Sequence, residues 1–156
     1  MLTPRKATYE DVISIAGRLR EADLKEIEAA GHTDPAAALA AGMHDHGTVL
    51  VGVDEEDVPH MIFGVGDSGV EGLGLVWMMA STTITDYWVQ ILRGTHEWVQ
   101  RLGSGYSALA NVVHADNTLH IRWLKWAGFV FLRKVEVNGH FFYEFAKIMP
   151  KEVNNV

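Results

Sequence analysis

The spacing of apolar residues along the chain predicts five helices, because apolar positions recur at steps of three and four. Polar start signals support two of them: Thr8 and Asp11 form a capping-box pattern, and Asp34 precedes a first-turn proline at Pro35. Glycines such as Gly31 and Gly128 provide the stops. We expect helices over about 9–20, 22–30, 35–42, 88–102 and 118–127.

Between these segments lie short runs rich in β-branched and aromatic residues, which indicate strands. The last two runs are joined by Asn138-Gly139, a strong signal for a tight hairpin. A strand, helix, strand, helix order in the middle favours a parallel crossover, so the fold class is α/β with a mixed central sheet flanked by helices. We expect strands over 48–53, 60–65, 75–80, 106–113, 129–137 and 140–148.

Length and composition fit one globular domain. The chain has 156 residues, 48% hydrophobic and 21% charged, and a domain of this size buries roughly 70% of the surface of its unfolded chain. With no long linker, we predict a single domain over residues 1–148 and a loose tail over 149–156.

Charge and cysteine content exclude several classes of function. The net charge of −7 argues against general nucleic-acid binding, which depends on Lys and Arg neutralising phosphates. The absence of cysteine excludes disulfides and thiolate chemistry. No apolar run reaches the length of about 18 residues that a membrane span needs. We therefore expect a protein of the cell interior that binds no membrane.

The stretch NTLHIRWLKWAGF, residues 117–129, gives the chain a specific resemblance. Together with the element order, its Asn117, Gly128 and Phe129 resemble the last helix of the GNAT superfamily of N-acetyltransferases. The resemblance implies the acyl-CoA N-acyltransferase fold. It also implies a pantetheine site between the strand ending at Ala80 and the strand starting near Tyr106.

Two positions depart from the GNAT pattern. The family holds the coenzyme A pyrophosphate on a Gly-rich loop, whereas this chain has STTITD at 81–86, without glycine and with the acidic Asp86. The usual tyrosine general acid is replaced by Leu124, which has no proton to donate. We expect no cofactor. If acetyl-CoA does bind, the resemblance places it on residues Ser81, Thr82, Thr83, Thr85 and Asn117.

The C-terminal half has a narrower resemblance, to the internal virion protein A family of short-tailed bacteriophages. This resemblance implies a phage-encoded virion-assembly protein in the host cytoplasm or the virion, with a degenerate acetyl-CoA site and a virion or host protein as partner. One alternative is an active acetyl-CoA-dependent N-acyltransferase with an unusual phosphate loop, and another is a phage protein that binds a host target. The matching residues are Asn117, His120, Ile121, Arg122, Leu124, Lys125, Gly128 and Phe131.

Individual side chains of the last helix are candidates for function. His120 shares a face with Leu124 and is the candidate general acid, although a histidine packed against a strand has the same pattern. A basic and aromatic surface is a common form of protein contact site. We predict a partner contact at Arg122, Trp123, Lys125 and Trp126, with core packing as the other interpretation of at least one tryptophan.

A metal site has little support in the sequence. His44, Asp45 and His46 offer imidazole and carboxylate groups near His60, but their spacing matches no established template and is typical of a polar turn. We predict no metal site from the sequence.

Overall fold

The computed structural model describes residues 1–43 and 47–150, which form seven strands, five α-helices and one 3-10 turn. The strands are β1 (Thr3–Lys6), β2 (Thr48–Val53), β3 (Pro59–Asp67), β4 (Leu73–Ala80), β5 (Ala108–His114), β6 (Val130–Val137) and β7 (His140–Ile148). The helices are α1 (Tyr9–Ala16), α2 (Glu21–Ala29), α3 (Pro35–Gly42), η1 (Ile84–Tyr87), α4 (Trp88–Gly103) and α5 (Thr118–Trp126).

All seven strands join one mixed sheet in the order β1-β2-β3-β4-β5-β7-β6. Among the described strands only the central β4 and β5 pair is parallel, and it is short: residues 73–75 pair with 108–110. Beyond Leu75 the two strands separate, while β4 remains paired with β3 as far as Ala80. The sheet therefore has a V-shaped opening between β4 and β5, where the sequence resemblance predicted it.

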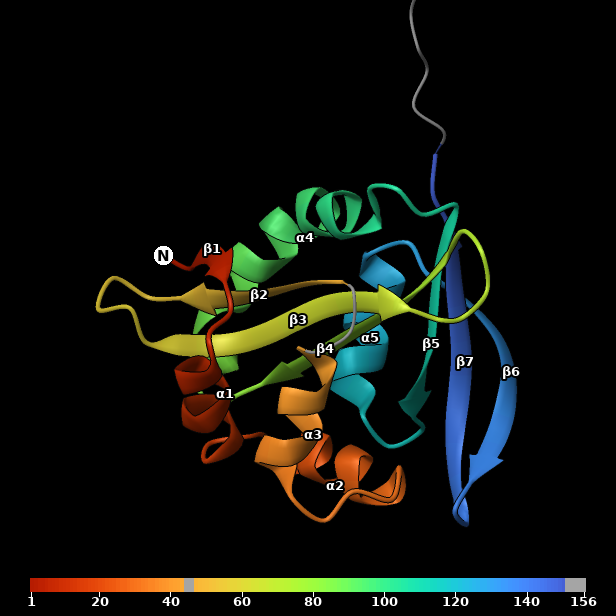
Figure 1. The fold of residues 1–156 in the computed structure, drawn as a ribbon, viewed down its shortest axis with the longest axis horizontal. Helices are drawn as coiled ribbons and strands as arrows, with labels where there is room; N and C mark the ends of the chain where they lie inside the picture. The colour runs from red at the N-terminus through yellow and green to blue at the C-terminus, as the bar shows by residue number, and fades with distance from the viewer. Residues whose placement is uncertain (44–46, 151–156) are drawn as a thin grey trace, which may run out of the picture.

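Helices cover both faces of the sheet (Figure 1). On one face, residues of α1, α2 and α3 pack against Val49, Val51 and Ile62. On the other face, α4 and α5 pack against Leu50 and Phe63. The alternation of Val49, Leu50 and Val51 between the two cores follows from the two-residue period of a strand. Elements α2 and α5 consequently lie on opposite sides of the sheet.

Several predicted elements are confirmed. The β6–β7 hairpin turns at Asn138 and Gly139 with φ of 51° and 79°, the positive values that this two-residue turn requires. The capping box of α1 is present at Thr8 and Asp11. The parallel crossover from β4 through α4 to β5 is also present.

Two segments differ from the prediction. Helix α1 ends at Ala16 rather than near Arg20, because the chain turns to place Leu19 beside Ser81 at the end of β4. Strand β1 was not predicted, since TPRK is short, polar and contains a proline. It lies at the edge of the sheet, where a strand tolerates proline.

Some predictions fall outside the described residues, namely those on His44, Asp45 and His46 and on most of the tail, 151–156. Within the two described ranges, no helix has the length and apolar character needed to cross a membrane.

Candidate functional site

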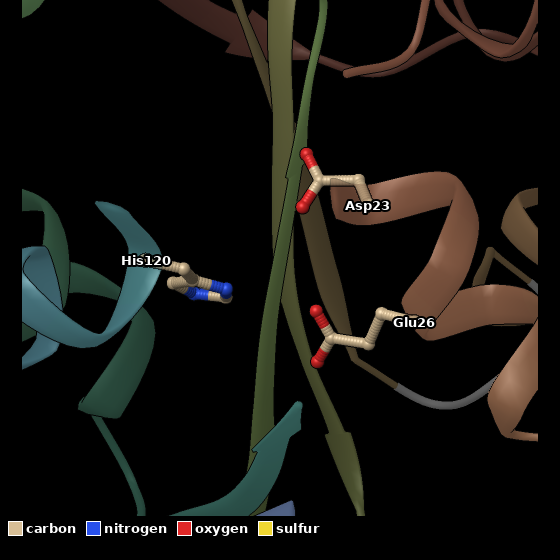
Figure 2. Close-up of side chains that lie close together, drawn as sticks. All are labelled: Asp23, Glu26 and His120. Atoms are coloured by element: carbon tan, nitrogen blue, oxygen red, sulfur yellow. The ribbon is translucent and has the colours of Figure 1, made fainter. Parts of the chain in front are cut away.

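Four buried polar side chains meet at the opening between β4 and β5. Asp23 and Glu26 come from α2, His120 comes from α5, and Asn117 precedes α5; their exposed fractions are between 1% and 8%. Figure 2 shows the imidazole of His120 facing both carboxylates across the gap. Because α2 and α5 cover opposite faces, these groups approach each other only where the sheet is open.

Asn117 connects the two carboxylates. Its Nδ2 donates to Oδ1 of Asp23 at 3.1 Å and to Oε2 of Glu26 at 3.0 Å. Backbone groups complete the network, since the N–H of Ala80 donates to Asp23 at 3.0 Å and that of His114 to Glu26 at 3.4 Å. Asn117 was predicted as a cofactor contact; its amide N–H groups are here engaged with protein carboxylates.

Burial shifts the proton affinity of the three ionisable groups. Desolvation raises the pKa of Glu26 to about 7. The hydrogen bond from Asn117 lowers this pKa, whereas the nearby charge of Asp23 raises it further. Desolvation also raises the pKa of Asp23, although Arg20 opposes it. Burial and the charge of Arg20 lower the pKa of His120 to about 4. At neutral pH the imidazole is therefore uncharged, whereas Glu26 is poised to exchange a proton.

Two hollows flank this cluster. An open pocket of about 230 Å³ is lined by Glu26 and His120 together with Met78 of β4 and Phe142 of β7. An outer polar pocket of about 350 Å³ is lined by Asn117, Arg20, Lys25 and His114. The buried cluster thus borders one pocket through Glu26 and His120 and the other through Asn117.

Four of the six backbone N–H groups of the 81–86 loop donate to the protein itself. The N–H of Ser81 donates to His60, that of Thr82 to Arg18, that of Ile84 to Ser81 and that of Asp86 to Thr83. The sequence resemblance predicted that this loop stands in the place of a Gly-rich phosphate loop.

Hydroxyl groups in the 81–86 loop also have protein partners. Oγ1 of Thr83 lies 2.6 Å from Nδ1 of His60 and 2.6 Å from Oγ of Ser81. The other ring nitrogen of His60 contacts Asp54 at 2.8 Å. Of the hydroxyl residues predicted to contact a cofactor, Ser81 is fully buried, whereas Thr82 and Thr85 are exposed.

The end of β4 that faces the opening is also occupied. The carbonyl of Ala80 accepts from the N–H of Arg20 at 3.0 Å, and the N–H of Ala80 donates to Asp23. Further back on this edge, the carbonyl of Val76 accepts from Nδ2 of Asn111 at 2.9 Å. An extended ligand that entered the V would need these same groups to pair with β4.

The residues of α5 divide between core and surface. Leu124 is buried, in agreement with its apolar character at the general-acid position. Trp123 is also buried, and its Nε1 donates to Oγ1 of Thr95 at 2.9 Å, so the prediction that Trp123 contacts a partner is wrong. Arg122, Lys125 and Trp126 are exposed together on the outer face.

The acidic half of the cluster was not predicted from the sequence. Asp23 and Glu26 lie in a polar segment, and their hydrogen bonds to Asn117 join residues 94 and 91 positions apart. One local signal was present: Asp23, Glu26 and Ile27 share a helical face by their three- and four-residue spacing. That face would have placed two carboxylates beside an apolar residue.

Comparison with known proteins supports the fold. No protein-family model and no curated protein matches the chain. Among solved structures, the ribosomal-protein-S18-alanine N-acetyltransferase from Escherichia coli has a TM-score of 0.70 at 14% identity, with 100% of this chain and 99% of that chain covered. A GCN5-related N-acetyltransferase from Kribbella flavida has 0.68 at 16%, covering 95% and 98%. The aminoglycoside acetyltransferase AAC(6')-Ib in complex with coenzyme A has 0.67 at 12%, covering 95% of each chain.

At these identities the likeness concerns the fold, which matches over nearly the whole of each chain. The mixed seven-stranded sheet, the helices on both faces and the opening between β4 and β5 agree with it. The chain therefore has the GNAT-like acyl-CoA N-acyltransferase fold.

Proposed function

We propose that this chain is a phage-encoded GNAT-like protein that acts in virion assembly by binding a protein partner, and that its acetyl-CoA site is degenerate. The phage part of the proposal rests on the sequence of residues 117–131. The loss of acetyl-CoA binding rests on the internal hydrogen bonds of the 81–86 loop and of Ala80. The protein would work in the host cytoplasm or remain in the virion.

The internal hydrogen bonds of the 81–86 loop are the main support. Phosphate binding at a loop and helix N-terminus needs backbone N–H groups that point outward. Four N–H groups of this segment donate to protein carbonyls, and Asp86 adds a negative charge that would repel phosphate. Freeing the donors would break the contacts that hold the loop to Arg18 and His60, so phosphate binding has a large free-energy cost.

A candidate partner surface lies on the outer face of α5. The side chain of Trp126 is 53% exposed, and its indole N–H donates to the carbonyl of Leu92 at 3.0 Å. This bond fixes the ring, so less conformational entropy is lost on binding. Arg122 and Lys125 flank it on the same helix, and Trp and Arg are common anchors of protein interfaces.

This surface is tested by affinity capture of phage proteins from an infected-cell lysate with wild-type and variant protein. Trp126→Ala and Arg122→Ala should each lower partner recovery about tenfold or more, because a central anchor contributes around 2 kcal/mol. Tyr9→Ala on α1 and Arg101→Ala on α4 are matched exposed controls and should retain full recovery. Unchanged recovery of every partner by the two α5 variants would exclude this surface.

An acetyl-CoA-dependent N-acyltransferase is the second candidate function. The open pocket lined by Glu26 and His120 and the raised pKa of Glu26, which suits a general base at neutral pH, favour it. His120 is a weaker acid candidate, since its low pKa leaves the ring neutral. Acetyl-CoA binding separates this function from the first.

A host-targeting role remains the third candidate and would use the same α5 surface. The capture experiment separates it from assembly by the identity of the partner. A virion protein recovered through Trp126 supports assembly, whereas a host protein recovered through Trp126 supports host targeting.

A further inference from the structure

The imidazole of His120 has an unused nitrogen in a buried position. Within the two described ranges, Nδ1 of His120 is the only buried side-chain nitrogen or oxygen without a hydrogen-bond partner. The side chain is 6% exposed, and Figure 2 shows its ring directed at Asp23 and Glu26. A neutral imidazole nitrogen that lacks a proton is an electron-pair donor, so a buried one without a partner is costly unless a ligand binds it.

The buried cluster around His120 carries more negative than positive charge. Asp23 and Glu26 are both buried, and the nearest cation, the guanidinium of Arg20, lies 3.4 Å from Asp23 in a loose contact. Two buried carboxylates beside one partly paired arginine leave one negative charge uncompensated when both are ionised. A bound cation would supply that charge and would also use the free nitrogen of His120.

The spacing of the three groups fits a common ion. One potential ligand atom from each of Asp23, Glu26 and His120 lies within 4.8 Å of the others. Zinc binds such nitrogen and oxygen atoms at about 2.0–2.2 Å, so two ligands of one tetrahedral ion lie about 3.4 Å apart. Side-chain rotations that bring the ligand atoms closer by up to about 1.4 Å would complete the site. Such rotations are well within the freedom of a glutamate side chain.

We propose that Asp23, Glu26 and His120 bind one divalent transition-metal ion of the Zn²⁺ type. The mixture of imidazole and carboxylate ligands favours zinc, iron or manganese over magnesium, which prefers oxygen ligands and retains its waters. Three protein ligands leave a coordination position for water. The ion would bridge α2 and α5 through the opening of the sheet and so hold its two faces together.

The surroundings have the features of a metal site beyond its ligands. Asn117 donates to both carboxylates and the N–H of Ala80 donates to Asp23. These hydrogen bonds fix the orientation of both acidic ligands. The pocket that Glu26 and His120 line is open to solvent and gives an ion a path to them. The proposal is independent of acetyl-CoA and of the partner surface.

The test is zinc titration of EDTA-treated, desalted protein by calorimetry, with bound metal counted by mass spectrometry. Wild-type protein should bind one Zn²⁺ per chain and gain thermal stability, while Mg²⁺ should bind at least about a hundredfold more weakly. Glu26→Gln and His120→Gln should each weaken zinc binding by about tenfold to a hundredfold or more. Glu28→Gln, an exposed neighbour on α2, and His96→Gln, an exposed residue on α4, should bind like wild type.

Three results would overturn the proposal. The first is no zinc binding by the wild-type protein at 100 μM ion, well above the range of a protein metal site. The second is unchanged zinc binding by folded Glu26→Gln and His120→Gln variants. The third is loss of zinc binding on changing His44 and His46 instead, which would assign the ion to those residues.

A measurement on wild-type protein keeps the test decisive if either site variant fails to fold. Crystals soaked in Zn²⁺ and measured at the zinc absorption edge should give an anomalous peak between α2 and α5. A peak elsewhere, with none between these helices, would contradict the proposal.

Discussion

At the scale of single residues, Asn117 determines whether the buried cluster is stable. Its side-chain N–H groups are shared between Asp23 and Glu26, and the residue is 1% exposed. Asparagine at this position was recognised from the sequence as part of a GNAT-like pattern. Its contacts could not be predicted, because both partners lie more than ninety positions away on α2.

Replacing Asn117 by aspartate should therefore destabilise the fold severely. Asn117→Asp keeps the shape of the side chain but removes both donors and adds a third buried carboxyl group. The free energy of unfolding should fall by about 3 kcal/mol or more at pH 8, the usual cost of an uncompensated buried charge. Urea denaturation measures it, with Gln100→Glu, an exposed amide-to-acid change on α4, as a control; a loss below about 1 kcal/mol would contradict the network.

Glu26 should make the stability of the metal-free protein depend on pH. Burial raises its folded pKa to about 7 from 4.5. A raised pKa contributes stability that is complete below pH 4.5 and is lost as pH rises through about 7, because the unfolded chain ionises first. Between pH 4.5 and 8, the wild-type protein should lose up to about 3 kcal/mol of its free energy of unfolding through ionisation of Glu26. The Glu26→Gln variant should not show this loss.

The measurement for Glu26 is urea denaturation of wild type and Glu26→Gln across pH 4.5 to 8, with EDTA present throughout. The difference between the two proteins isolates Glu26, since His120 and Asp23 remain in both. Parallel stability curves for the two proteins would show that Glu26 titrates normally.

At the scale of elements, the connection between α1 and α2 covers the edge of β4 that borders the V. The sequence predicted one helix to Arg20, because Leu19 continues the apolar period of α1. In the fold, Leu19 is buried beside Ser81 and the segment 18–20 pairs with the end of β4. Periodicity alone could not distinguish a fourth helical turn from this pairing, since both bury Leu19.

This pairing should be detectable by amide hydrogen exchange. The N–H of Arg20 donates to Ala80 and that of Thr82 to Arg18, so both should be protected well beyond exposed loop amides. Exchange of both amides at the rate of an unstructured peptide would mean that this edge of β4 is open to a ligand. The amide of Gly69, in the loop before β4, is a suitable unprotected reference.

At the scale of the whole molecule, the sequence predicted the α/β class, the parallel crossover and the final hairpin. These features depend on local periodicity and turn chemistry, which short segments contain in full. The buried cluster depends on an opening in the sheet and on two helices from opposite faces. Such an arrangement follows from tertiary packing, so the residues of α2 that form it resembled an ordinary polar helix.

In the proposed function, a GNAT-like fold has lost its acetyl-CoA site because four N–H groups of the 81–86 loop and the N–H of Ala80 donate within the protein. Calorimetric titration of the wild-type protein with acetyl-CoA tests this most directly, with an active N-acetyltransferase as positive control. We expect no binding at 1 mM ligand. A dissociation constant below about 100 μM, within the ordinary range for enzyme substrates, would contradict it and favour the acyltransferase function.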